Sequence, residues 1–256
     1  MATGRTILRY MRAYADGYNI SCDVTKFGPL VCQFGDDTVS TLCGEVKGTL
    51  CGKCVQTPGT LNGLMDSTAT TGLHTVMSSA GVSRNFMFPF GIRAIPAQGD
   101  PVYCGKFVQN GYMVEPSDSS PVAVSIPIGQ YDASAGLNFD RPWGVMIHEY
   151  AAETGANSTE YVDGGAGTSK GAWMQWQIFA VAGTGTVQLT AEHCDTADGA
   201  YAAITGLDST ALAHTAVPCA GWAQTTTTTA IKRYFRFQVA LSGITSVTFA
   251  LALMRG

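Results

Sequence analysis

The stretch that decides the fold is IKRYFRFQVALSGITSVTFALALM, residues 231–254. Apolar and polar side chains alternate along residues 231–241, although Arg233 interrupts the apolar side near the start, and apolar residues recur at every second position over residues 246–254. A period of two is typical of β-strands that place one face on a core. The inward side chains are expected to be Ile231, Phe235, Phe237, Val239, Leu241, Val247, Phe249, Leu251 and Leu253. The sequence therefore predicts two strands here.

The rest of the second half has the same character. Short apolar runs cover residues 145–150, 172–180 and 184–193, and Asp198-Gly199 is a tight-turn signal. No helical periodicity interrupts them, so we predict a β-sandwich, either immunoglobulin-like or jelly-roll-like. Because the preceding segment, DASAGLNFDRPW, is rich in turn-forming residues, the chain is expected to divide into domains 1–131 and 132–256.

The first half is predicted to be a β-sandwich or barrel with one helix. Leu73, Val76, Met77 and Ala80 have helical spacing within residues 70–80, and Gly81 can terminate the helix. The expected strands are residues 6–14, 27–34, 85–90, 101–114 and 121–128. The chain as a whole is therefore expected to be mainly β.

The segment from Phe34 to Asp66 is less regular. Asp36, Asp37 and Thr38 could cap a short helix, because carboxylates are favourable near a helix N-terminus. Helix-like spacing then follows at Val39, Leu42, Val46 and Leu50. Two glycines, at positions 44 and 48, disfavour a helix by about 1 kcal/mol each. We predict a long loop that contains a helical turn.

Eight cysteines leave several kinds of chemistry open. They are Cys22, Cys32, Cys43, Cys51, Cys54, Cys104, Cys194 and Cys219. Cys51 and Cys54 could form half of a zinc site with Cys43 or Cys32, or a redox pair. His193, Cys194, His214 and Cys219 could form another metal site. Each half has an even number of cysteines, so each half could form its disulfides internally, and Cys194 would then pair with Cys219. Disulfides between subunits are also possible, and free thiols are the alternative.

Composition excludes several functional classes. The net charge of −4 over 256 residues gives no basic face for nucleic acid, and no apolar run is long enough to span a membrane. The N-terminus does not have the pattern of a secretory signal. Only 13% of residues are charged, and 30 are glycine. This low charge suggests that copies of the chain cover much of each other's surface.

No enzyme motif is present, and no cofactor or metal is predicted. The sequence has no G-x-S-x-G, phosphate-binding loop or H-E-x-x-H motif. The one dense acidic cluster, Glu149, Glu153, Glu160 and Asp163, lies in a loop-like region. A carbohydrate-active enzyme would need two such carboxylates facing each other across a cleft. We therefore expect a protein that is not an enzyme.

Several short motifs occur together in the first half. They are DGYNIS (16–21), GDDT (35–38), VKG (46–48), LNGLMD (61–66) and VSIP (124–127). In this order, residues 5–131 resemble the major tail tube proteins of long-tailed bacteriophages. The second half resembles β-sandwich domains that phages append to tail and head proteins, in the stretches 173–178, 198–201, 233–236 and 249–255.

The resemblance implies a structural virion protein whose rings, expected to be hexameric, stack into a tube for DNA ejection. A loop that carries Asp36, Asp37, Val46 and Leu50 would contact the adjacent ring, with its cysteines placed to lock it. The implied partners are the protein itself and other tail proteins at the tube ends, while DNA passes without specific binding and no membrane is involved. The implied location is the virion tail, after synthesis in the host cytoplasm. The alternative is a head decoration or cement protein, or a minor tail adhesion protein that binds capsid or host glycans.

Overall fold

The computed structural model describes residues 8–39, 48–68, 71–92, 94–118, 120–131, 141–157 and 160–256. Within these residues the chain is mainly β with one short α-helix, which confirms the predicted fold class. The elements of the first half are η1 (Leu8–Tyr10), β1 (Tyr14–Ala15), β2 (Tyr18–Asn19), β3 (Val24–Phe27), β4 (Val31–Val39), β5 (Gly48–Thr57), β6 (Thr60–Leu64), α1 (Leu73–Met77), β7 (Ser83–Pro89), β8 (Pro101–Gln109), β9 (Met113–Glu115) and β10 (Ala123–Tyr131). Those of the second half are β11 (Trp143–Glu153), β12 (Ala156–Asn157), β13 (Val162–Asp163), β14 (Ala172–Cys194), β15 (Ala202–Asp208), β16 (Leu212–Ala213), η3 (His214–Ala216), β17 (Cys219–Gln224) and β18 (Tyr234–Arg255).

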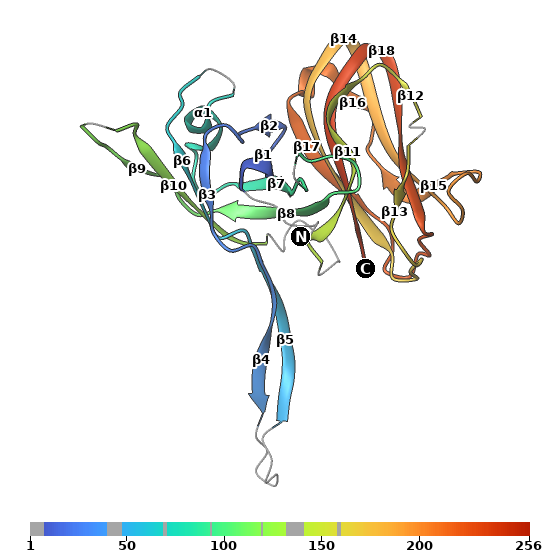
Figure 1. Cartoon of the computed structure of the whole chain (residues 1–256), viewed down its shortest axis with the longest axis horizontal. Coiled ribbons are helices and arrows are strands. Elements are labelled where there is room, and N and C mark those ends of the chain that lie inside the picture. The colour runs from blue at the N-terminus through green and yellow to red at the C-terminus, as the bar shows by residue number, and fades with distance from the viewer. Residues whose placement is uncertain are drawn as a thin grey trace.

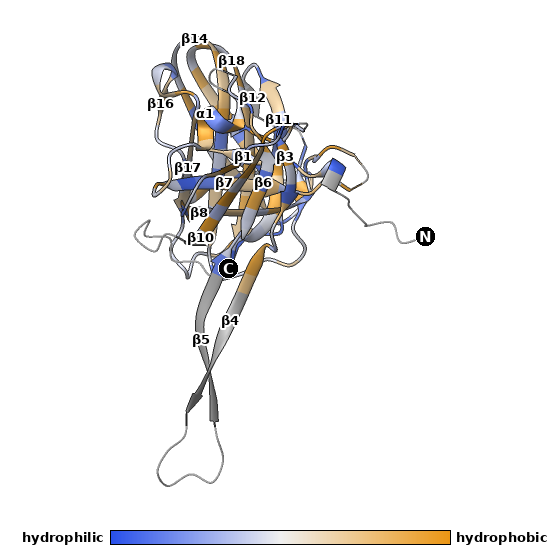
Figure 2. Ribbon diagram, turned by 90° about the vertical axis from the view of Figure 1, so that its left-hand side faces the viewer, coloured by the Kyte–Doolittle hydropathy of each residue, from blue (hydrophilic) through white to orange (hydrophobic). Residues whose placement is uncertain are grey.

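Antiparallel pairing joins most of the described strands into one curled network. Its main path runs β15-β14-β18-β11-β8-β10-β6-β3, and the shorter strands attach along it. Strands β4 and β5 form a separate two-stranded sheet that leaves the body as a long arm (Figure 1). Apolar residues recur along the strands of the body, as their shared cores require (Figure 2).

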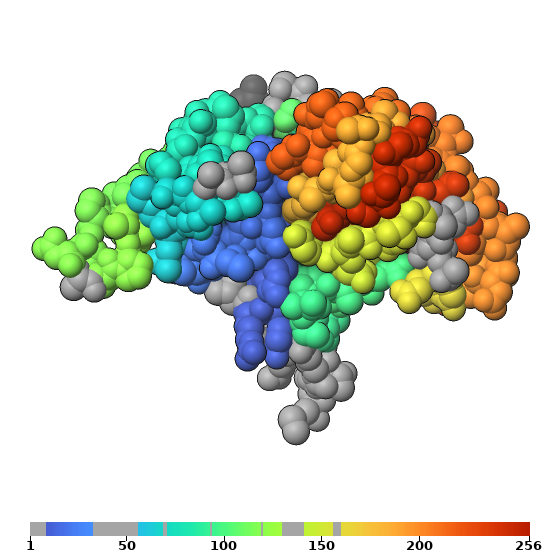
Figure 3. Space-filling model, turned by 90° about the horizontal axis from the view of Figure 1, so that it is seen from above, coloured from blue at the N-terminus to red at the C-terminus, as the bar shows by residue number. Residues whose placement is uncertain are grey.

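The body contains three clusters of buried apolar side chains. One is built from the first half and includes Leu61, Phe86 and Ile126 beneath α1. Another is built from the second half, around Phe249 and Trp176. A third contains Tyr14 and Met87 from the first half together with Trp173, Met254 and others from the second. The two halves thus lie side by side with a shared apolar contact (Figure 3). The division at residue 131 stays a prediction, because residues 132–140 lie outside the described part.

Among the described strands, β14 and β18 form the longest antiparallel pair. Their pairing extends from Ala172 with Arg255 to Cys194 with Tyr234. Register shifts interrupt it near Gly183, which has a φ of +100°. The sequence predicts separate strands over residues 172–180 and 184–193, but both belong to the continuous strand β14. The strands predicted over residues 231–241 and 246–254 likewise merge into β18. Gly183 at the register shift lets β14 bend while it stays paired with β18.

A turn from the first half is inserted against β14 and β17. The turn Asp16-Gly17 joins β1 to β2, as the sequence predicts, with φ values of +49° and +84°. The Gly17 amide donates a buried 2.6 Å hydrogen bond to Gln177 Oε1, and Gln177 Nε2 donates to the Asn85 carbonyl at 3.0 Å. A Cβ built on Gly17 would lie 2.6 Å from the Ile178 carbonyl oxygen. Only glycine therefore fits this contact without movement of the backbone.

Two predictions for the first half were wrong in extent. The sequence predicts a strand over residues 6–14, but residues 8–10 form η1, Met11 makes an isolated antiparallel bridge to Phe90, and β1 covers only residues 14–15. The predicted helix over residues 70–80 is confined to α1, residues 73–77, and Ala80 is exposed. Leu73, Val76 and Met77 are buried as predicted. The rest of the helical pattern is not used, because the strand β7 begins at Ser83, soon after the positive-φ Gly81.

The segment from Phe34 to Asp66 also differs from its prediction. Its described residues form the two strands of the arm and then β6, with no helical turn among them. Asp36 pairs with Cys51, and Asp37 pairs with Leu50. Cross-strand pairing satisfies the backbone of these residues without a helix, in which Gly48 would have been unfavourable. Residues 40–47 lie outside the described part of the chain.

Candidate assembly site

A four-stranded antiparallel sheet forms one end of the first half. Its strand order is β9-β10-β6-β3, and each neighbouring pair is antiparallel. In the described part of the chain, β9 pairs only with β10, and β3 pairs only with β6. The two outer strands therefore present free edges on opposite sides of the same sheet. Unpaired edges of this kind are templates for the addition of another strand.

The even number of strands has a geometric consequence. Because each strand runs antiparallel to its neighbour, β9 and β3 run in opposite directions. A second copy in the same orientation can therefore place its β3 antiparallel to β9 of the first. Such a contact joins two different edges and is therefore heterologous. Repeated from copy to copy, it forms a ring when the rotation between neighbouring copies adds up to a full turn.

The inner face of the sheet packs on the core of the first half. Leu61, Val124, Ile126 and Ile128 are buried there with the side chains of α1. Directly paired residues project to the same face. The pairs Val114–Val124 and Phe27–Leu61 therefore assign Val114 and Phe27 to this inner face. Val114 is 41% exposed because no strand lies beyond it.

The outer face carries small or uncharged side chains between two charges. The pairing assigns Thr60, Asn62, Leu64, Ala123, Ser125, Pro127, Met113, Glu115 and Lys26 to this face. None of them is buried. Lys26 lies on the edge strand β3, and Glu115 lies on the edge strand β9. The middle of the face has no charge.

Exposed apolar side chains gather at the projecting end of this sheet. Met113 on β9 is 51% exposed, and Leu64 at the end of β6 and the following Met65 are 38% and 40% exposed. In Figure 3, the residues around β9 extend beyond the rest of the molecule. Apolar groups on a projecting ribbon indicate a surface that another protein covers.

Among the described residues, hydrogen bonds join the β4–β5 arm to the body at its base. Tyr103 donates a 2.7 Å hydrogen bond from Oη to the Val31 carbonyl, and Thr57 Oγ1 donates to the Ile128 carbonyl at 3.0 Å. Beyond this base, the described strands pair only with each other. A two-stranded hairpin alone in water is marginally stable. A neighbouring subunit that packs on the arm would stabilise it.

Of the four residues predicted to contact the adjacent ring, three lie in the described part of the chain. Asp36, Asp37 and Leu50 lie on the paired strands of the arm. Val46 lies outside the described residues. Their role in a contact between subunits stays a prediction.

The cysteines do not support the predicted disulfide of the second half. Cys22 is an exposed thiol, Cys104 and Cys194 are buried thiols, and Cys219 is a half-buried thiol. Cys194 pairs with Tyr234 at the end of β14, whereas Cys219 pairs with Ile178 far along the same strand, so they are not bonded to each other.

The remaining cysteines belong to the arm. Cys32 is exposed at the start of β4, and Cys43 lies outside the described residues. Cys51 and Cys54 lie within β5 rather than at a helix start, which removes the structural setting that a redox C-x-x-C motif requires.

The candidate metal and catalytic residues are also separated. In the described ranges, no three His, Cys, Asp or Glu side chains are grouped to hold a metal. His193 Nδ1 accepts from the Lys232 amide, and His214 Nδ1 accepts from the Gly185 amide.

No helix of the described part is long and apolar enough to cross a membrane.

The acidic cluster is used in structural contacts. Glu153 Oε1 lies 3.0 Å from His148 Nε2, and Asp163 accepts a bidentate contact from Arg233 at 2.6 and 2.8 Å. The hydrogen bonds from Arg233 and then from the Gly165 amide lower the pKa of Asp163 to about 2. A carboxyl with this pKa is ionised at neutral pH and cannot donate a proton as a general acid.

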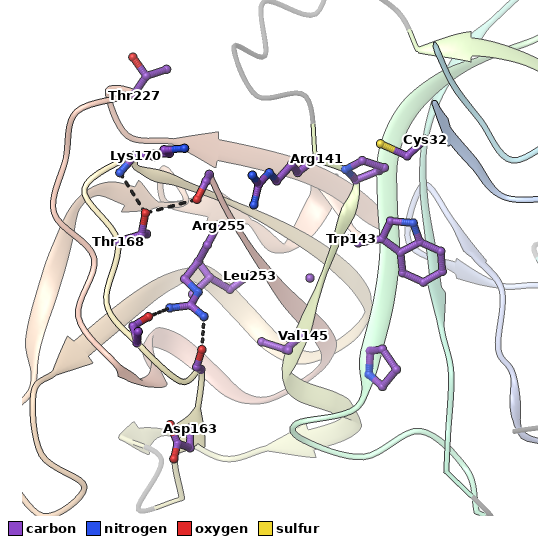
Figure 4. A pocket seen from close by; sticks show the side chains of 16 residues that line it. Cys32, Arg141, Trp143, Val145, Asp163, Thr168, Lys170, Thr227, Leu253 and Arg255 are labelled. Atoms are coloured by element: carbon purple, nitrogen blue, oxygen red, sulfur yellow. Dashed lines mark hydrogen bonds between the residues drawn. The ribbon is translucent and has the colours of Figure 1, made fainter. Parts of the chain in front are cut away.

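A cavity of about 1050 Å³ lies where the two halves meet (Figure 4). Trp143, Val145 and Leu253 form part of its apolar wall. The Arg255 guanidinium points into the space between the strands and donates to the carbonyls of Gly164 and Ala166. Arg255 thus holds the loop that precedes β14.

Sequence reasoning missed three residues that organise these surfaces. Gly17 was recognised only as part of a turn, and Lys26 and Glu115 were not singled out. Residues 101–114 were predicted as one strand, but β8 ends at Gln109 and β9 begins at Met113. The Asn110-Gly111 pair between them is a turn signal that could have revealed the edge strand.

Comparison with known proteins shows little similarity. No protein-family model matches the chain, and no curated protein sequence matches it. Among solved structures, the chain is similar to the Dit protein (gp 19.1) of phage SPP1, described as a paradigm of the hub adsorption apparatus in phages that infect Gram-positive bacteria. The TM-score is 0.34 and the identity is 10%, over 95% of this chain and 99% of that chain.

Proposed function

We propose that this protein is a structural subunit of a long-tailed phage tail, in which copies join edge to edge into rings and the rings stack into the tail tube. The observation that carries the proposal is the four-stranded sheet with oppositely directed free edges, β9 and β3. The motif order of residues 5–131 supports the tail assignment. The low charge of the chain also fits extensive burial between copies.

The outer face of this sheet fits the wall of a channel for DNA. Affinity for DNA comes largely from lysine and arginine contacts to phosphate. The middle of the face offers only uncharged groups such as Thr60, Asn62 and Ser125. DNA would therefore pass without being held. The proposed subunit has no enzymatic role, is made in the host cytoplasm and resides in the virion tail with other tail proteins at the tube ends.

In this proposal the β4–β5 arm connects successive rings. Two features support this role. The arm projects away from the body (Figure 1), and its described strands, β4 and β5, pair only with each other. Phe34 pairs with Cys54. Replacement of residues 35–53 by Asn-Gly would therefore shorten both strands equally and leave a closed hairpin.

Electron microscopy of the purified protein tests the proposal. The wild type should form filaments with a central channel, and the shortened-arm variant should form single rings that do not stack. Circular dichroism should show that the variant keeps its fold. Wild-type protein that forms only isolated trimers, or that binds capsids as separate knobs, would contradict the tube and support a decoration role.

A further inference from the structure

Glu115 and Lys26 lie at the two free edges of the four-stranded sheet, on the same outer face. Both are exposed, and neither side chain has a salt bridge or hydrogen bond in the part of the chain that the structure describes. We propose that Glu115 of one copy pairs with Lys26 of the next, and that this ion pair sets the register between copies. The inference rests on the proposed edge-to-edge assembly.

The pairing within one chain defines the possible registers. Met113, Ser125, Asn62 and Lys26 form one row across the sheet. A second copy added in the same rows would place its Lys26 beside Met113 and leave Glu115 without a cation. A stagger of two residues instead places Lys26 opposite Glu115. Since side chains alternate with a period of two, this stagger keeps every residue on its own face.

The inner face is consistent with the same stagger. It places the exposed Val114 of one copy against Phe27 of the next, so that two apolar side chains meet. Phe27 is half-buried and packs edge-on against Phe88, with the ring centroids 5.2 Å apart. A sheet that closes into a barrel also requires its strands to be staggered.

The two charges also disfavour the wrong partner edges. A two-fold contact of β9 with β9 leaves Glu115 without a cation, and the register centred on Glu115 brings two glutamates together; a two-fold contact of β3 with β3 leaves Lys26 without an anion in the same way. Like charges directly opposite each other in a sheet are destabilising. The ion pair therefore favours the head-to-tail contact over a two-fold dimer, which would block ring growth.

Zero-length cross-linking tests the pair directly. A carbodiimide joins a lysine amine to a carboxylate only when they touch. Within one chain, the edge strands are separated by three strand spacings, about 14 Å, so Lys26 and Glu115 of the same copy cannot react. We expect mass spectrometry of assembled wild-type protein, mixed from isotopically heavy and light copies, to show a Lys26–Glu115 peptide that joins heavy to light.

Charge reversal provides the second test. Glu115→Lys and Lys26→Glu should each raise the protein concentration required for assembly about tenfold. The double variant Glu115→Lys/Lys26→Glu should restore assembly to near the wild-type concentration. Asp118→Lys is the matched control, because Asp118 is exposed near Glu115 but lies outside β9. It should assemble like the wild type.

The outcomes separate the inference from the function on which it rests. Wild-type protein that stays monomeric overturns the edge-to-edge function and this pair with it. Rings that form without the Lys26–Glu115 cross-link, and that tolerate both single reversals, overturn the pair and leave the function intact. Equal weakening by Asp118→Lys and Glu115→Lys would also overturn the pair, because general charge would then explain the effect.

Discussion

Replacement of Gly17 by alanine should destabilise the whole protein, because this residue fits into a contact between the two halves. The added Cβ would lie 2.6 Å from the Ile178 carbonyl oxygen and 2.7 Å from the Cys219 carbonyl oxygen. Both neighbours are backbone atoms of paired strands, so neither can move without disturbing β14 or β17. The turn that carries Gly17 would have to withdraw.

The magnitude follows from two costs. A non-glycine residue at a φ of +84° costs about 1–2 kcal/mol. Withdrawal of the turn also breaks the hydrogen bond from the Gly17 amide to Gln177 Oε1 and leaves a buried acceptor unsatisfied, which costs about 1–3 kcal/mol. The total is about 2–5 kcal/mol. For a chain of this size it corresponds to a fall in melting temperature of about 10 °C.

Differential scanning calorimetry measures this change, and Gly81→Ala is a matched control. Gly81 has a similar φ of +79°, but no atom lies within 4 Å of the Cβ that alanine would add. Gly81→Ala should therefore show only the conformational cost, about 1–2 kcal/mol. Equal losses of stability in the two variants would refute the argument, because the inserted turn would then contribute nothing beyond its backbone conformation.

Two further predictions concern protonation and reactivity. The pKa of Asp163 is held at about 2 by Arg233, below the ordinary value of 3.8, so its contribution to stability is complete at neutral pH and is lost progressively as the pH falls below about 4 and through the folded-state value. Asp163→Asn should therefore melt below the wild type at pH 7, and the gap should narrow steadily as the pH is lowered towards 2; a constant gap in thermal melts would contradict this. Burial raises the pKa of Cys219 to about 11 and raises that of Cys104. Iodoacetamide followed by mass spectrometry should therefore label the exposed Cys22 in the native protein and these two thiols only after unfolding, whereas native labelling of Cys104 would disprove its burial.

Alternation predicted the strands well where one face meets a core. Phe235, Phe237, Val247 and Phe249 are all buried as expected. Residues 250, 252 and 254 are buried as well, because the opposite face of β18 contacts the first half. Periodicity within one strand describes only its own side chains and does not show what covers its second face.

The arm shows why local spacing failed. Val39 and Leu50 fit a helical spacing in the sequence, yet both lie on strands of the arm. A strand pair satisfies its backbone through a partner segment, and no local pattern reports that partner. The same limit hid the contact between Gly17 and Gln177, which are 160 residues apart.

The edge strands were unpredictable for a related reason. Glu115 and Lys26 are ordinary surface residues in the sequence, and their positions acquire meaning only from the strand order. The motif resemblance implied that copies assemble into rings. It did not identify which strands have free edges, because that depends on pairing across the whole first half.

The shared apolar contact between the halves determines which parts of this chain could be exchanged. Side chains of β14 alternate between two clusters, with Trp173 facing the first half and Met174 facing the second-half core. A shortened chain without residues 132–256 would expose Tyr14, Met87 and their neighbours to water. Recombination or engineering that treats the second half as a detachable module would therefore yield an aggregating product.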